Sequence, residues 1–139
     1  MRASVEPEVL LVEDNADDVA IARRAFRQSQ IEEKLAVARG GAEALDYLKR
    51  PEHVLPKVIL LDLRMPLLDG FEVLQRLRAE VRTRDIPVVI VSTSARREDV
   101  ESCYRLGANS FVVKQYSPFH PGRYLVDVAR YWLDLNRLP

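Results

Sequence analysis

Short apolar runs alternate along the chain with longer helical patterns, five times over, and this alternation constrains the fold more than any other feature. Strands are expected at residues 9–12, 35–38, 58–61, 88–91 and 111–113. Three of the runs are continuous rather than alternating, which is typical of strands buried on both faces of a parallel sheet. A parallel sheet needs right-handed crossovers, which place helices on both of its faces.

The expected helices carry recognisable start signals. Asp69 and Glu72 form an N-cap and N3 pair for the third helix, and Ser94 is expected to cap the fourth. Asp17 and Asp18 fall in the first turn of the first helix, where we interpret them as residues that complement the helix dipole rather than as ligands. The third helix has an expected core stripe of Leu74, Leu77 and Val81.

Five such units predict an α/β protein with a flavodoxin-like (βα)5 doubly wound parallel sheet in strand order 2-1-3-4-5. In this architecture ligands bind outside the carboxyl ends of the strands, beside strand 1. Strands 1 and 3 are neighbours there, so Asp14 and Asp62, which follow them, are expected to meet. Ser92 and Lys114 follow the fourth and fifth strands at the same edge.

These strand-end residues suggest one chemistry. Three carboxylates in one crevice, from Glu13, Asp14 and Asp62, repel one another and favour a hard divalent cation, for which Mg²⁺ is the best candidate. With the metal in place, Asp62 can act as a nucleophile toward phosphorus and form an acyl phosphate. Lys114 and Ser92 can then neutralise or hydrogen-bond the phosphoryl oxygens.

Composition sets the outer limits. The 139 residues suit one domain, expected to span 1–139 with its core at about 8–135. The 21 basic residues balance the 21 acidic ones, so the net charge gives no general electrostatic attraction to nucleic acid or to an anionic membrane. The chain has no apolar stretch of spanning length, and its single cysteine, Cys103, suits a reducing cytoplasm.

Four motifs in register, "LVEDN", "LLDLRMPLLDG", "IPVVIVSTSA" and "FVVK", resemble the receiver domains of bacterial two-component response regulators. The resemblance covers roughly residues 8–135. It implies that Asp62 is the phospho-acceptor, that Asp14 is a direct metal ligand and that Glu13 holds metal-bound water. It also implies that the backbone carbonyl of Arg64 is a metal ligand, and that the Arg64 and Ser94 side chains occupy positions that tune dephosphorylation.

The same resemblance assigns three further roles and shows one departure. Ser92 is the switch hydroxyl, Lys114 contacts the phosphoryl group, and Phe111 stands where the family has an aromatic switch residue. Phe111 also suits a core position, since an aromatic residue in a sheet usually packs. Receivers usually follow the lysine with a proline in a cis bond, whereas this chain has Gln115, which leaves the cis or trans state of that bond open.

The last helical stretch, "GRYLVDVARYWLDL", has only one narrow charged stripe. Packing on its own sheet should use a third to a half of such a helix, so the rest would be an exposed apolar patch. We therefore predict a homodimer through this helix, the fourth helix and the fifth strand. The alternative is that the helix lies deep against its own domain.

Together these features predict a stand-alone receiver, since the chain ends at Pro139 just after the fifth helix. Such a protein takes its phosphoryl group from a sensor histidine kinase and signals through contacts with a downstream protein; it is not an enzyme beyond its own phosphorylation and dephosphorylation. The stretch "STSARREDVESCYRLGANSFVVK" and the "RYWL" tail resemble the small regulators paired with bacterial phytochrome kinases.

Two rival interpretations remain from the sequence, and a third is least favoured. A haloacid-dehalogenase-like phosphatase would carry a second Asp two residues after the nucleophile, where this chain has Arg64. A degenerate receiver acting as a phosphorylation-independent binding module is kept open by Gln115. A flavodoxin is disfavoured because the first βα loop is the acidic "EDNADD" rather than a Ser/Thr/Gly-rich phosphate cradle.

Overall fold

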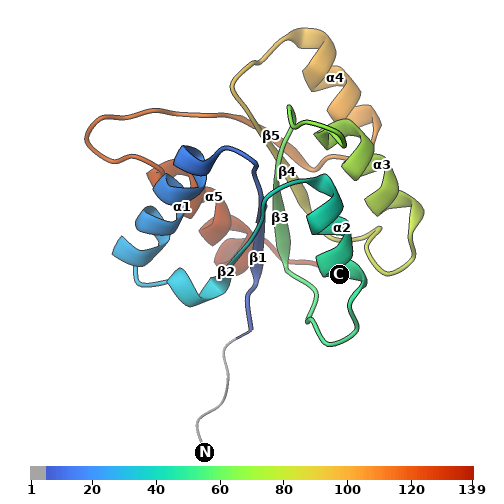
Figure 1. Ribbon diagram of the computed structural model, residues 1–139, viewed down its shortest axis with the longest axis horizontal. Coiled ribbons are helices and arrows are strands. Elements are labelled where there is room, and N and C mark those ends of the chain that lie inside the picture. Colours follow the sequence, from blue (N-terminus) through green and yellow to red (C-terminus); the bar gives the residue numbers. More distant parts are fainter. Residues whose placement is uncertain (1–5) are drawn as a thin grey trace, which may run out of the picture.

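The computed structural model describes residues 6–139, so residues 1–5 of the predicted domain lie outside the described part. Five parallel strands form one sheet in the order β2-β1-β3-β4-β5, as predicted (Figure 1). The strands are β1 Val9–Val12, β2 Leu35–Ala38, β3 Val58–Asp62, β4 Val88–Ser92 and β5 Ser110–Val113.

Helices cover both faces of the sheet (Figure 1). They are α1 Ala16–Gln28, α2 Gly41–Lys49, α3 Gly70–Ala79, α4 Arg97–Arg105 and α5 Arg123–Arg130. A short 3₁₀ turn, η1 Glu32–Lys34, precedes β2, and a π-helical turn, η2 Tyr131–Leu135, continues α5. Within residues 6–139 no helix has the length and apolar character needed to cross a membrane.

Alternate residues of each central strand pack on opposite faces. In β1, Val9 and Leu11 belong to the core beneath α1 and α5, whereas Leu10 and Val12 belong to the core beneath α2, α3 and α4. All four side chains are buried. Burial on both faces requires apolar residues at every position, and this explains why the strands read as continuous apolar runs.

The third helix is shorter than predicted. It ends at Ala79, and Val81, expected in its core stripe, is 76% exposed. The chain turns there because Glu80 is extended and the buried Thr83 hydroxyl donates a hydrogen bond of 2.7 Å to the carbonyl oxygen of Leu77. That bond satisfies a carbonyl of the last helical turn and leaves no place for another turn of helix.

The prediction that Ser94 caps the fourth helix is wrong. The N-cap is Arg96, which makes no side-chain capping hydrogen bond. Ser94 instead accepts a hydrogen bond of 3.3 Å from the backbone N–H of Arg96, which shapes the turn that leads into α4.

Candidate functional site

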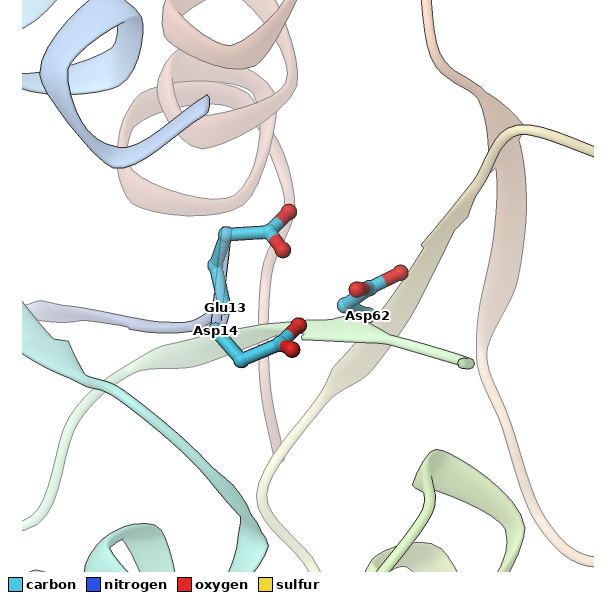
Figure 2. A group of neighbouring side chains, drawn as sticks. All are labelled: Glu13, Asp14 and Asp62. Carbon is cyan, nitrogen blue, oxygen red and sulfur yellow. The ribbon is translucent and has the colours of Figure 1, made fainter. Parts of the chain in front are cut away.

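The ends of β1 and β3 bring three carboxylates together. Val12 pairs with Leu61 in the parallel ladder, so the residues that follow Val12 lie beside Asp62. Figure 2 shows the side chains of Glu13, Asp14 and Asp62 pointing toward one another. One carboxylate oxygen from each lies within 4.8 Å of the other two, which makes a group that could hold a metal ion.

The surroundings of this group penalise negative charge. Glu13 and Asp62 are buried and Asp14 is half-buried. Burial raises the pKa of Asp62 to about 7, with the charge of Glu13 and a hydrogen bond shared with it adding to the rise and Lys114 opposing it. A hard divalent cation bound by carboxylate oxygens removes this penalty, so the donor set fits Mg²⁺ or a similar ion.

Lys114 is the positive group of the site. It follows β5, and its backbone N–H donates a hydrogen bond of 2.8 Å to the carbonyl oxygen of Ser92. Its Nζ lies 2.7 Å from Glu13 Oε1 and 3.7 Å from Asp62 Oδ1, and its side chain is 6% exposed. Burial lowers the pKa of Lys114, but hydrogen bonds to Glu13 and Asp18 outweigh this effect, so the net pKa is raised and the ammonium stays charged.

Asp18 lies outside the metal-binding group, as predicted, but it also contacts the site through Lys114, which the helix-dipole interpretation did not foresee. Its Oδ2 accepts a hydrogen bond of 2.9 Å from Lys114 Nζ. Asn15, the N-cap of α1, holds this turn by accepting a hydrogen bond of 3.0 Å from the Asp18 backbone N–H. The signal available in the sequence was the position of Asp18 in the turn directly after β1, at the edge where the other site residues gather.

Ser92 and Phe111 occupy different environments. Ser92 is buried at the end of β4, one residue beyond Val91, which pairs with Asp62. Its Oγ accepts a hydrogen bond of 3.2 Å from the backbone N–H of Ser94. Phe111 is half-buried and packs against the core on the α2–α4 side, as the core interpretation predicted. Its role as a switch stays a prediction.

Arg64 ties the loop after β3 to α4. Its Nη2 donates a hydrogen bond of 2.6 Å to Oδ2 of the buried Asp99, and its guanidinium lies 5.5 Å from the centroid of the Phe71 ring. The sequence did not reveal this ion pair, because nothing local connects residues 35 positions apart.

The structure also shows the state of the peptide bond after Lys114, which the sequence did not determine. The Lys114–Gln115 peptide bond is trans, as is every other peptide bond in residues 6–139.

A family model described as "Response regulator receiver domain" matches residues 9–120, which contain the whole acidic group and Lys114. The chain belongs to the response regulator receiver domain family. The receiver interpretation is thereby confirmed over the phosphatase and flavodoxin alternatives.

Three proteins to which this chain is similar are each matched over most of their length. The probable methanogenesis regulatory protein FilR2 of Methanothrix harundinacea (strain 6Ac) is 38% identical over 134 residues, covering 94% of this chain and 86% of FilR2. The phosphorylated cyanobacterial phytochrome response regulator RcpA is 30% identical with a TM-score of 0.86, covering 97% of this chain and 99% of RcpA. The Mn²⁺-bound form of response regulator Rcp1 is 30% identical with a TM-score of 0.82, and the match covers 96% of this chain and 99% of Rcp1.

Proposed function

We propose that this receiver accepts a phosphoryl group from a sensor histidine kinase onto Asp62 and signals through contacts with another protein. The observation that carries the proposal is the convergence of Glu13, Asp14 and Asp62 with the buried ammonium of Lys114. The protein turns over no substrate other than its own phosphoryl group. We place it in the cytoplasm, where its partner kinase would present the phosphohistidine.

The cation in this proposal is Mg²⁺. Asp14 and Asp62 would bind it directly, Glu13 would hold a metal-bound water, and the backbone carbonyl of Arg64 would complete the protein's ligands. When bound, the metal supplies charge neutralisation for the transferring phosphoryl group. The similarity to Rcp1, which has a Mn²⁺-bound form, supports a divalent cation here.

The chain's own residues perform the transfer. An Asp62 carboxylate oxygen attacks phosphorus, the P–N bond to the kinase histidine breaks, and the histidine nitrogen leaves with the bonding electrons. Lys114 donates N–H hydrogen bonds to the phosphoryl oxygens, and the Ser92 hydroxyl donates another. Movement of Ser92 toward the new phosphoryl group and an inward turn of Phe111 would carry the signal to the surface.

Intact mass spectrometry tests the acceptor directly. Wild type incubated with acetyl phosphate and Mg²⁺ is expected to gain one phosphoryl group, and the gain should vanish without Mg²⁺ or in Asp62→Asn. Asp17→Asn is the matched control, because it removes an exposed carboxylate of the adjoining helix turn and should leave the gain intact. A folded wild type with no adduct would favour the alternative, a phosphorylation-independent binding module.

The names of the similar proteins point to different kinds of partner kinase. RcpA is a phytochrome response regulator, which supports a phytochrome kinase as the partner. FilR2, at 38% identity, is named for methanogenesis instead. A phytochrome kinase is therefore the narrower proposal, and faster phosphotransfer from it than from an unrelated sensor kinase would support that pairing.

A homodimer is also part of the proposed function. The α5 helix buries Leu125, Val126 and Ala129 against its own sheet, while Tyr131 is 47% and Leu135 is 74% exposed. An open groove of about 540 Å³ runs beside these residues, lined by Asn109, Ser110, Val112, Asp127, Val128, Tyr131 and Trp132. This face of α5, η2 and β5, which mixes exposed apolar side chains with polar ones, would meet a second copy of the chain together with α4.

The expected dimer can be measured by light scattering. Wild type should have twice the monomer mass, and Tyr131→Glu should be monomeric because it puts a charge into the apolar face. Val54→Glu, at a comparably exposed apolar residue in the loop before β3, should stay dimeric. A wild type that is monomeric with and without acetyl phosphate would contradict the dimer.

A further inference from the structure

The Lys114 ammonium is held on three sides. Its Nζ lies 2.7 Å from Glu13 Oε1, 2.9 Å from Asp18 Oδ2 and 3.7 Å from Asp62 Oδ1. An ammonium has three N–H donors, of which two are hydrogen-bonded to Glu13 and Asp18. The third donor is left for the Asp62 side, where the phosphoryl group would be attached.

The two carboxylates that bind Lys114 differ in what else they can do. Glu13 belongs to the group that could hold the metal, whereas Asp18 lies outside that group. Asp18 sits in the first turn of α1, and its side chain is only 20% exposed. A metal would compete with Lys114 for Glu13, whereas Asp18, which is not in that group, would stay available to the ammonium.

We propose that Asp18 is a positioning residue that keeps the Lys114 ammonium beside Asp62 when the cation takes Glu13. The inference rests on the proposed phosphoryl transfer to Asp62. Lysine is a compact charge on a flexible four-carbon stem, so its position depends on what anchors it. Without Asp18, Glu13 and Asp62 would be the ammonium's remaining partners, so it would compete with the cation for them and would not be held ready for the phosphoryl oxygens.

The simpler explanation for Asp18 is that an acidic residue in a first helical turn complements the helix dipole. Asp17 has the same charge in the same turn but is exposed. Within residues 6–139 the ion pairs of Lys114 are with Glu13, Asp18 and Asp62, so Asp17 is not among its partners. Asp17→Asn therefore reproduces the loss of charge near the site without the loss of the anchor.

The experiment is a double-mutant cycle with two readouts. Asp18→Asn and Asp17→Asn are each made in wild type and in Lys114→Met. The rate of phosphorylation by acetyl phosphate is followed by intact mass, and the affinity for Mg²⁺ alone is measured by calorimetry. Thermal unfolding of all variants establishes that each is folded.

If Asp18 positions Lys114, the effects of mutating the two residues should be coupled in both the phosphorylation rate and the Mg²⁺ affinity. Asp18→Asn should slow phosphorylation roughly three- to tenfold, as expected for the weakening of one charge-assisted hydrogen bond, and should weaken Mg²⁺ binding more than Asp17→Asn does. In the Lys114→Met background, both differences between Asp18→Asn and Asp17→Asn should disappear, because there is no ammonium to position.

Two results would overturn the inference. One is that Asp18→Asn behaves like Asp17→Asn in both readouts, and the other is that the effects of Asp18→Asn persist in Lys114→Met. If wild type takes no phosphoryl group at all, the proposed function fails. The Mg²⁺ titrations then still decide whether Asp18 keeps the ammonium from competing with the cation for Glu13.

Discussion

Replacement of Lys114 by methionine is expected to slow phosphorylation of Asp62 by roughly a hundredfold, the size seen when one preorganised donor to a developing charge is removed. The effect should be large because the ammonium is buried and lies 3.7 Å from Asp62 Oδ1. In a water-poor site a fixed positive charge stabilises the transferring phosphoryl group more than solvent can. The measurement is the time course of phosphorylation by acetyl phosphate and Mg²⁺, followed by intact mass.

Lys57→Met is the matched control for this loss of charge. Lys57 lies just before β3, at the opposite end of the strand from Asp62, and its Nζ pairs with Glu8 at 2.9 Å. Its removal should leave the phosphorylation rate within about twofold of wild type, because a distant exposed charge is screened by salt. Equal rates for the two variants would mean that Lys114 does not take part in the transfer.

The second large effect concerns stability. In the metal-free protein, Asp62→Asn is expected to be more stable than wild type at pH 8 by about 2 kcal/mol, after allowance for solvent screening at the neighbouring half-buried Asp14. Burial and the charge of Glu13 raise the pKa of Asp62 to about 7 in the folded state. In the unfolded chain this carboxyl has an ordinary pKa of about 4.

The direction of the pH dependence follows from these two pKa values. Between about pH 4 and pH 7 the folded protein holds a proton on Asp62 that the unfolded chain has lost, so wild-type stability falls as the pH rises through this range. The advantage of Asp62→Asn should therefore be largest above about pH 7 and shrink as the pH falls from about 7 toward 4. Mg²⁺ should also reduce it, because the cation stabilises the ionised wild-type group.

Urea unfolding in the presence of a chelator measures this advantage. Asp46→Asn is a suitable control, because Asp46 is an exposed α2 residue that pairs with Arg50. Its stability difference from wild type should be small at every pH. An Asp62→Asn variant that is no more stable than wild type at pH 8 would mean that the ionised carboxylate is not penalised in the fold.

The strand order and the principal site could be predicted because both are encoded locally. The central strands β1, β3 and β4 are buried on both faces and the edge strands in part, so all five apolar runs are visible without knowledge of their neighbours. Strand order then places the carboxyl ends of β1 and β3 side by side, and the sequence already shows Asp14 and Asp62 following those strands.

The features that the sequence missed depend on long-range partners or on where an element ends. Asp18 satisfies a helix dipole as well as a lysine 96 positions away, and local reasoning detects only the first role. Val81 continues the apolar periodicity of α3, but the turn set by Thr83 ends the helix before it. Helix α5 gives way to a π-helical turn at Tyr131, which no periodicity argument anticipates.

Chemical trapping of the acyl phosphate tests most directly that Asp62 is the acceptor. Borohydride reduces an aspartyl phosphate to homoserine, so peptide mapping after reaction with acetyl phosphate, Mg²⁺ and borohydride identifies the residue that was phosphorylated. The account predicts homoserine at position 62, and none when Mg²⁺ is removed by a chelator. Homoserine at position 14, or at no position in a folded protein, would contradict it.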